Sequence, residues 1–295
     1  MVEPLFNRLV LIGIGHIGAS IAGGLRLHPG IVGHLVISDA DPAHLARAEA
    51  LGLGDEYVAD AAAAVRGADG VILCTPVGSF AAIAEKIAPH LAPGCVLSDV
   101  GSTKGSVIRD VSPFVPEGVS FVPAHPMAGT EFSGPDAGLP NLFEGRWCLL
   151  TPEAGTSEAA IGKIETLWQT LGARTARMDA AHHDRVLAIV SHLPHLIAFT
   201  ICGTADDLAD ETRDEVLQFA ATGFRDFTRI AASDPVMWRD IFINNKDALL
   251  EMLARFSEDA QAMARAVRWG DTNYIEDRIN RSRKIRKNLI DIKQA

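Results

Sequence analysis

The chain has 295 residues, of which 48% are hydrophobic and 22% are charged, and its formal net charge is −10. This length suits about two domains, and the composition is that of an ordinary globular protein. Because nucleic-acid affinity depends largely on Lys and Arg that neutralise phosphates, the negative charge disfavours a nucleic-acid partner. The bulk properties favour chemistry on a small molecule.

We expect neither export nor membrane insertion. The first residues lack the basic region and apolar run of a secretory signal, so a cytoplasmic protein is expected. The most apolar window, residues 186–202, contains Ser191 and two histidines and is too short and too polar for a membrane span. The four cysteines lie far apart without C-x-x-C spacing, which favours reduced packing residues and no metal site.

Short β-branched segments alternate with helical patterns up to about residue 178. Such alternation predicts an α/β fold with a mostly parallel, doubly wound sheet and crossover helices on both faces. Helical periodicity then continues to the end, so we place a sheet domain at 1–178 and an all-α domain at 179–295. The expected strands are 9–14, 35–38, 71–74, 96–99, 119–123 and 147–150, and the expected later helices are 184–205, 214–232, 235–267 and 273–290.

A glycine-rich turn, Gly-Ile-Gly-His-Ile-Gly at residues 13–18, follows the first expected strand and opens a helix. The first glycine permits the tight turn, the second lets the backbone approach a pyrophosphate, and the third lets helix and strand pack closely. The helix N-terminus supplies NH donors and positive potential. In this context the spacing predicts a Rossmann-type dinucleotide site.

Asp39 ends the second expected strand, where a carboxylate can accept hydrogen bonds from the adenosine ribose and repel a 2′-phosphate. NAD is therefore favoured over NADP. Asp39 could instead cap the helix near Pro42, although Asp41 is better placed for that role. The predicted cofactor-binding residues are Gly13, Ile14, Gly15, His16, Ile17, Gly18, Asp39, Thr75 and Pro76, the last two at a strand end where the nicotinamide half normally lies.

Residues 99–104, Asp-Val-Gly-Ser-Thr-Lys, close a further strand and lead into a helix. By the same edge rule Ser102 falls beside the nicotinamide, where its hydroxyl can donate to a substrate or orient a base. The alternative role for Ser102 is the N-cap of the helix after Lys104.

Residues 121–131, Phe-Val-Pro-Ala-His-Pro-Met-Ala-Gly-Thr-Glu, place one histidine between two prolines after an apolar strand. Flanking prolines restrict the backbone to extended or turn conformations, so His125 is expected at a strand end with a fixed direction. Local sequence leaves two interpretations open: a buried histidine satisfied by a carbonyl, or an imidazole presented to a substrate.

A kinked helix is predicted around Pro194, which deprives the Val190 carbonyl of its hydrogen-bond partner. Ser191 and His195 lie four residues apart on one face of this helix, and the bend can aim that face into a cleft. A satisfied core histidine is the alternative interpretation of His195.

Two arginines, Arg225 and Arg229, share one face of a predicted helix at 223–229. Asp226 can neutralise one guanidinium, which leaves the other to bind a substrate carboxylate through a bidentate contact. A purely structural ion-pair network is the alternative.

The helices after residue 235 carry more apolar side chains than a narrow buried stripe requires. This excess predicts a homodimer formed through the C-terminal helices, with an ordinary bundle core as the alternative. The basic cluster at 278–287 is expected to be a solvated helix face rather than a nucleic-acid site.

Five segments together resemble the prephenate and arogenate dehydrogenases of tyrosine biosynthesis. They occur in the family's order and span nearly the whole chain, and the His-Pro-Met-Ala-Gly-Thr segment is far more specific than the glycine loop. The segments are the glycine loop at 13–18, Asp-Val-Gly-Ser-Thr-Lys at 99–104, His-Pro-Met-Ala-Gly-Thr-Glu at 125–131, Ser-His-Leu-Pro-His at 191–195 and Gly-Phe-Arg-Asp-x-x-Arg at 223–229.

The resemblance implies oxidative decarboxylation of a cyclohexadienol, in which hydride passes to the nicotinamide, carbon dioxide leaves and the ring becomes aromatic. By this resemblance His125 accepts the proton of the substrate hydroxyl, a task that suits an imidazole with a pKa of about 6.5. Ser102 would orient the hydroxyl and the nicotinamide, and Arg229 would bind the ring carboxylate. The residues at positions that line the substrate side chain or gate the pocket are Thr130, Glu131, Ser191 and His195.

The resemblance leaves the substrate open between prephenate, which would give 4-hydroxyphenylpyruvate, and arogenate, which would give tyrosine. Glu131 could contact the ammonium of arogenate, yet it also occurs in relatives that prefer prephenate, and we favour prephenate. Arg225 is expected to be structural and paired with an acid. Since the chain ends soon after the helices, no regulatory ACT domain or chorismate mutase is expected, and tyrosine would have to inhibit at the active site.

Two other functions compete with this hypothesis. A β-hydroxyacid dehydrogenase also joins a Rossmann domain to helices, but it uses a helical lysine, for which only Lys246 offers a match. A non-catalytic nucleotide-sensing dimer would use the glycine loop without hydride transfer.

Overall fold

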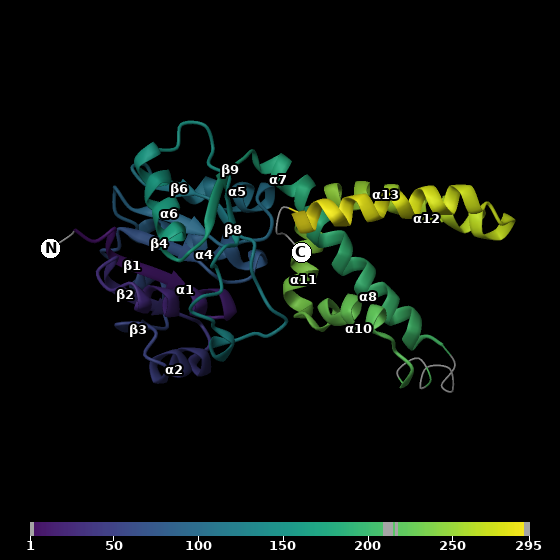
Figure 1. Cartoon of the computed structure of the whole chain (residues 1–295). Coiled ribbons are helices and arrows are strands. Elements are labelled where there is room, and N and C mark those ends of the chain that lie inside the picture. The colour runs from purple at the N-terminus through teal and green to yellow at the C-terminus, as the bar shows by residue number, and fades with distance from the viewer. Residues whose placement is uncertain (1–2, 209–214, 216–217, 292–295) are drawn as a thin grey trace. The chain divides into compact units, whose positions relative to one another are not determined.

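The computed structural model describes residues 3–208, 215 and 218–291. The chain divides into two compact units, Met1–Lys246 and Asp247–Ala295. The first unit contains both β-sheets and the helices that surround them, and the second contains two long helical segments (Figure 1).

Six parallel strands form the main sheet of the first unit, in the order β3-β2-β1-β4-β5-β6 (Figure 1). The strands are β1 (Phe6–Ile12), β2 (Val32–Ser38), β3 (Glu56–Val58), β4 (Gly70–Leu73), β5 (Val96–Asp99) and β6 (Ser120–Val122). The strand order reverses at β1, which pairs with β2 on one side and β4 on the other. Doubly wound sheets bind dinucleotides at such a switch point, at the carboxyl ends of the strands. The predicted Rossmann-type fold is confirmed.

A second sheet departs from the prediction in detail. Its strands are β7 (Ala124–Pro126), β8 (Trp147–Leu150) and β9 (Arg174–Arg177), with β7 antiparallel and β9 parallel to β8. The predicted strand 119–123 ends at Val122, since Pro123 has no NH for the ladder. His125 therefore lies within a short strand of its own. Strands β3, β7 and β9 escaped prediction because they are short and lack a continuous apolar run.

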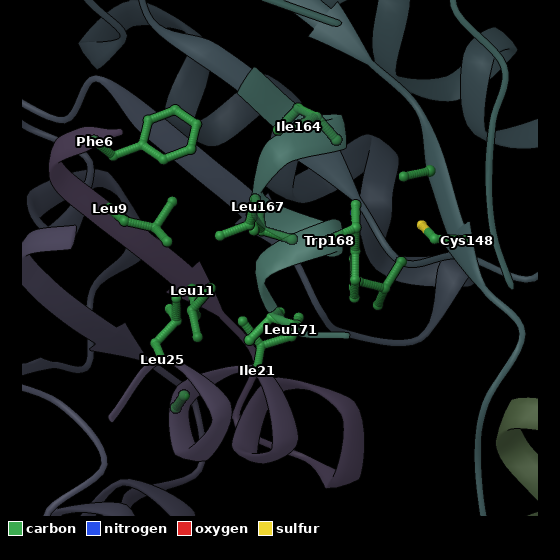
Figure 2. Packing of buried hydrophobic residues seen from close by; sticks show 14 of the residues in the cluster. Phe6, Leu9, Leu11, Ile21, Leu25, Cys148, Ile164, Leu167, Trp168 and Leu171 are labelled. Carbon is green, nitrogen blue, oxygen red and sulfur yellow. The ribbon is translucent and has the colours of Figure 1, made fainter. Parts of the chain in front are cut away.

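Helices cover both faces of the main sheet. They are α1 (His16–Leu27), α2 (Pro42–Ala50), α3 (Ala61–Ala64), α4 (Phe80–Ile87), α5 (Gly105–Val111) and α6 (Glu158–Thr170), with short turns η1 (Val77–Ser79), η2 (Ala88–His90), η3 (Ser112–Phe114) and η4 (Pro135–Ala137). Alternate residues of β1 face opposite cores. Leu9 and Leu11 pack in one cluster with α1 and α6 (Figure 2), and Val10 packs in the other with α3, α4 and α5. Burial on both faces holds the strand ends that carry the candidate site.

A long helix begins directly after β9 and runs through α7 (Ala180–Leu187), a π-helical segment η5 (Ala188–His192) and α8 (Leu193–Asp206). The predicted irregularity at Pro194 is present: the helix widens into the π turn immediately before the proline, where an i→i−4 hydrogen bond is lost.

The length and hydropathy of this 27-residue helix are also sufficient to cross a membrane, contrary to the expectation drawn from residues 186–202. Core helices meet the same criteria. His183, Asp184 and His192 on this helix are buried and hydrogen-bonded to other parts of the first unit. The first half of the helix is therefore part of the core of the first unit, although only 28% of the most apolar window of the helix is buried.

Among the described residues, the first unit also contains α10 (Thr222–Thr228), the turn η6 (Arg229–Ala232) and α11 (Pro235–Asn244). Part of the predicted helix 214–232 lies outside the described residues. Asp234 caps α11 by accepting a hydrogen bond from Met237 N at 2.8 Å, and Pro235 lies in the first turn. The predicted single helix 235–267 is wrong, since Asn245 interrupts it between α11 and α12 (Lys246–Trp269).

The second unit holds most of α12 and all of α13 (Thr272–Asp291), joined at Gly270, whose φ is +68°. Arg278 and Asp259 form an ion pair between the two helices, which lie side by side (Figure 1). Two helices alone cannot bury all their apolar side chains, and large ones remain exposed here: Leu250, Phe256, Val267, Trp269, Ile279, Ile285 and Ile290.

Candidate active site

The glycine loop has the backbone that a pyrophosphate requires. Gly13 has a φ of +98°, and a Cβ there would lie 2.7 Å from Thr75 Cγ2. A Cβ on Gly18 would lie 2.2 Å from the Gly13 carbonyl oxygen. By contrast, a Cβ on Gly15 would meet no atom of the described chain within 4 Å, and Gly15 is the N-cap of α1 without a side-chain cap. Open space in front of free helix NH groups fits a bound phosphate.

Asp39 holds the glycine loop in place. Its carboxylate accepts hydrogen bonds from Ile14 N and Asp41 N, both at 2.8 Å. The alternative role as the cap of α2 belongs instead to Asp41, which accepts from Ala43 N at 2.8 Å. Asp39 thus lies at the carboxyl end of β2 beside the loop, where the adenosine ribose of a dinucleotide is expected.

The other predicted cofactor residues border the same loop. His16 Nδ1 donates to the Ala137 carbonyl at 2.7 Å, while its buried Nε2 has no hydrogen-bond partner among the described residues. Ile17 follows on α1. Thr75 places its methyl group near Gly13 and shares a 2.7 Å hydrogen bond with Ser79, and Pro76 precedes η1.

His125 is at the centre of a buried chain of polar side chains. Its Nδ1 lies 2.9 Å from His183 Nε2, and His183 Nδ1 lies 2.8 Å from Asp184 Oδ1. Asp184 also accepts hydrogen bonds from the backbone NH groups of Lys104 and Gly105, both at 2.8 Å. Strand β7, helix α7 and the start of α5 therefore meet at His125.

The surroundings keep both imidazoles neutral. Burial lowers the pKa of His125 well below its usual range, and the nearby His183, Lys104 and His192 lower it further. Burial likewise lowers the pKa of His183, although Asp184 opposes that effect. Burial raises the pKa of Asp184, but hydrogen bonds from His183 and two backbone NH groups outweigh it, so that carboxyl is ionised.

A buried ion pair supports the backbone next to His125. Lys104 and Asp99 are fully buried and form a salt bridge. Lys104 Nζ donates to the Ala124 carbonyl at 2.7 Å, and Asp99 Oδ1 accepts from Ala124 N at 3.2 Å. The pair therefore forms hydrogen bonds with both the NH and the carbonyl group of Ala124, the residue that precedes His125.

Ser102 lies between these two charged residues in the chain and is partly exposed. It does not cap α5: Lys104 is the N-cap residue, and Asp184 supplies the carboxylate for the first NH groups. Its hydroxyl makes no hydrogen bond to a described residue, which leaves it available to a ligand.

The π turn presents His195 to an aromatic cluster. His195 Nδ1 donates to the Ser191 carbonyl at 2.9 Å, so the predicted proximity of these residues is present. The imidazole stacks on Trp238 with ring centroids 3.6 Å apart, and Phe199 packs against the same indole. Burial lowers the pKa of His195, which favours a neutral ring with its second nitrogen unprotonated.

Arg229 pairs with Glu131 rather than with Asp226. Arg229 Nη1 lies 3.2 Å from Glu131 Oε2, and the arginine side chain is 62% exposed. Thr130 Oγ1 accepts from Phe132 N at 3.3 Å. Arg225 is exposed and forms no ion pair with any described residue, contrary to the expectation of a structural pair. The structure therefore brings Arg229 to the segment that follows His125.

Several residues of this site were missed from the sequence. His183, Asp184 and Asn245 lie far from His125 in the chain; the polar triplet His-His-Asp at 182–184 could have indicated the first two, and no local signal marks Asn245. Asp99 and Lys104 belong to the motif at 99–104, but the sequence did not indicate that they form a buried ion pair. Lys246, the rival catalytic lysine, is exposed at the start of α12.

Known proteins place this geometry in a family. Residues 21–177 match the family model for the prephenate dehydrogenase nucleotide-binding domain, and residues 179–280 match that for the prephenate dehydrogenase dimerization domain. The cyclohexadienyl dehydrogenase of Zymomonas mobilis is 39% identical over 283 residues, which are 96% of each chain. The prephenate dehydrogenase of Bacillus subtilis is 36% identical over 256 residues, 85% of this chain and 67% of that protein.

A solved structure agrees with both matches. The prephenate dehydrogenase of Aquifex aeolicus in complex with hydroxyphenyl propionate and NAD+ superposes with a TM-score of 0.88 at 31% identity, covering 96% of this chain and 98% of that one. The glycine loop and the matched nucleotide-binding domain indicate a nicotinamide cofactor, and the matched helices form a dimerisation domain. The chain therefore belongs to the prephenate dehydrogenase family of oxidoreductases.

Proposed function

We propose that this protein catalyses the NAD-dependent oxidative decarboxylation of prephenate to 4-hydroxyphenylpyruvate in L-tyrosine biosynthesis. The observation that carries the proposal is His125, which lies buried in β7 among groups that keep its imidazole neutral. A neutral imidazole can accept the proton of the hydroxyl whose carbon loses hydride. Ser102, whose hydroxyl has no hydrogen-bond partner among the described residues, orients that substrate hydroxyl.

In the proposed reaction His125 is the one acid–base group, which first accepts and later returns a proton. His125 accepts the hydroxyl proton as the carbinol carbon becomes a carbonyl carbon. A nicotinamide held by the glycine loop, Thr75 and Pro76 would supply the acceptor for the hydride that leaves that carbon. The electron pair of the ring–carboxylate bond then enters the ring, carbon dioxide leaves, and His125 returns the proton to the phenolate oxygen. Aromatisation makes the sequence effectively irreversible.

Arg229 is proposed to bind the ring carboxylate. Its guanidinium is largely exposed and pairs with one described residue, Glu131, so an incoming carboxylate can replace Glu131 through a bidentate contact. Thr130, Glu131, Ser191 and His195 are proposed to surround the substrate side chain. The stacking of His195 on Trp238 gives that part of the site a fixed wall.

The cofactor is proposed to be NAD, held by residues 13–18, Asp39, Thr75 and Pro76. The open space at Gly15 and the free N-terminus of α1 support pyrophosphate binding. The Asp39 carboxylate would accept from ribose hydroxyls and repel the 2′-phosphate of NADP.

Arogenate, with direct formation of tyrosine, is the second candidate reaction. Glu131 favours it, because its carboxylate could turn from Arg229 to the ammonium group of arogenate. The relative from Zymomonas mobilis carries the broader name cyclohexadienyl dehydrogenase.

We further propose a cytoplasmic homodimer with its domains at 1–178 and 179–295. The exposed apolar side chains of α12 and α13, together with the match to a dimerisation domain, support association through these helices.

A steady-state grid of the purified enzyme with prephenate or arogenate and with NAD or NADP tests the proposal through nicotinamide absorbance. We expect the highest kcat/KM with prephenate and NAD. Faster turnover of arogenate than of prephenate would instead support the second candidate reaction, the conversion of arogenate to tyrosine. Tight NAD binding without turnover of either substrate would favour a nucleotide-sensing dimer.

A further inference from the structure

The contacts on Asp184 determine which nitrogen of His183 carries a hydrogen. Asp184 is ionised, and its two carboxylate oxygens accept hydrogen bonds from Lys104 N and Gly105 N. A carboxylate can only accept, so the 2.8 Å contact to His183 requires a hydrogen on His183 Nδ1. In a neutral His183, Nε2 is then a lone-pair acceptor.

The same reasoning determines the state of His125. Its Nδ1 lies 2.9 Å from His183 Nε2, and since that atom accepts, His125 Nδ1 must donate. A neutral imidazole carries one ring hydrogen, so His125 Nε2 is left with a free lone pair. This is the nitrogen that can take a proton from a substrate.

The Asp184 end of the chain is anchored independently. Asn245 Nδ2 donates to the Asp184 backbone carbonyl at 2.8 Å and to His192 Nδ1 at 3.0 Å. Asn245 is buried at the break between α11 and α12. Helix α7 is itself capped by Asp179, whose carboxylate accepts from His182 N at 3.0 Å. His183 is therefore held from several elements and not by His125 alone.

We infer that His183 and Asp184 are positioning residues that fix His125 in the tautomer with Nε2 unprotonated and stabilise the imidazolium formed when Nε2 accepts the substrate proton. The inference rests on the proposed function of His125 as the base. The positive charge gained by His125 is linked through two hydrogen bonds to the Asp184 carboxylate, which lowers the free energy of the proton-accepting state. His183 touches neither substrate nor cofactor in this role.

Two substitutions at His183 separate its two proposed functions. One function is to fix the tautomer of His125, and the other is to link the charge of the His125 imidazolium to Asp184. In His183→Gln, the side-chain amide oxygen can still accept from His125 Nδ1, but the amide cannot share positive charge with Asp184. In His183→Leu, both functions are lost. His182→Gln is the matched control, because this neighbouring histidine on the same helix is exposed.

The first measurement is ¹⁵N NMR of histidine-labelled protein, assigned with His125→Asn. We expect the wild type to carry the ring hydrogen of His125 on Nδ1, His183→Gln to retain it there, and His183→Leu to shift it partly to Nε2. A hydrogen on Nε2 in the wild type would overturn the inference. This measurement needs no turnover, so it holds even if the proposed substrate is wrong.

The second measurement is kcat and KM with prephenate, alongside NAD binding as a test of folding. We expect kcat to fall on the order of 100-fold in His183→Leu, less in His183→Gln and not at all in His182→Gln. KM should change little, since His183 is not proposed to contact substrate. Unchanged kcat in a folded His183→Leu protein would overturn the inference.

Discussion

The two ends of the candidate site hold their charges differently. Around His125, Asp99 and Lys104 are fully buried and Asp184 nearly so, and each has several hydrogen-bond partners. Around Arg229 the side chain is 62% exposed, and its one ion-pair partner among the described residues is Glu131. The buried end is preorganised for proton transfer, whereas the exposed end can exchange its protein partner for a substrate. Substitutions at the two ends should therefore differ in kind.

The largest effect is expected from His125→Asn, which removes the base and leaves the glycine loop intact. We expect kcat to fall on the order of 100- to 10,000-fold, the range usual for a general base, with unchanged NAD affinity. Steady-state kinetics and a NAD fluorescence titration measure the two quantities. Lys246→Met is the control, and the assignment fails if that change abolishes turnover while His125→Asn retains it.

The next effect is on stability. Lys104→Met leaves Asp99 charged, buried and unpaired, so we expect a loss of about 3–5 kcal/mol in the free energy of unfolding. Lys86→Met, which breaks the exposed pair with Asp60, should have little effect. Urea unfolding compares the two. The additional change Asp99→Asn should restore part of the loss, and equal effects of Lys104→Met and Lys86→Met would contradict the buried role.

The contrast also explains what the sequence could predict. Residues at the carboxyl ends of β1, β2 and β5 were found because parallel strands bring their ends to one edge, so position in the chain predicts position in space. The fold class, the glycine loop, Asp39 and the motif around Ser102 all follow from that rule. His125 was found from its flanking prolines, although its own short strand was not.

The partners of these residues could not be predicted in the same way. His183 is 58 residues from His125 in the chain, and Asn245 is 61 from Asp184. Such pairs depend on how the helices pack, which local periodicity does not determine. Asp226 was expected to neutralise one of the two arginines because it is near them in sequence, whereas the observed pair joins Arg229 to Glu131, which is 98 residues away.

At the exposed end, Arg229→Gln should raise the KM for prephenate on the order of 10- to 100-fold, since a charge-assisted carboxylate contact is lost. The kcat should change less than in His125→Asn. Arg225→Gln is the matched control, an exposed arginine on the adjoining helix without an ion pair among the described residues. If kcat falls by a larger factor than KM rises, Arg229 acts in the chemical step and not mainly in substrate binding.

The pH dependence of kcat is a further test of the buried end of the site, which contains His125. Burial lowers the pKa of His125 well below its usual value of about 6.5, with His183, Lys104 and His192 acting in the same direction. The carboxylates of Asp184 and Asp99 raise the pKa of the neighbouring His183. The base must be unprotonated, so kcat should stay constant through neutral pH and fall only well below pH 6.5. An acidic limb at or above that value in the kcat profile would contradict a buried neutral base.

The smallest change in activity is expected from substitution of Asp39. The Asp39 carboxylate serves two purposes. It accepts hydrogen bonds from Ile14 N and Asp41 N, and it is proposed to repel the 2′-phosphate of NADP. In Asp39→Asn the single amide oxygen can replace one of these bonds, and the negative charge disappears. We expect kcat/KM for NAD to fall and the preference for NAD over NADP to narrow by about tenfold.

Asp41→Asn provides the comparison for this change. Its side chain caps α2 and is exposed, and asparagine is an equally good N-cap, so neither stability nor cofactor preference should change. Because Asp39 also holds the glycine loop, affinity for both dinucleotides should weaken together with the loss of discrimination. If Asp39→Asn narrows the preference without weakening NAD binding, the contact to Ile14 is dispensable and the charge alone selects the cofactor.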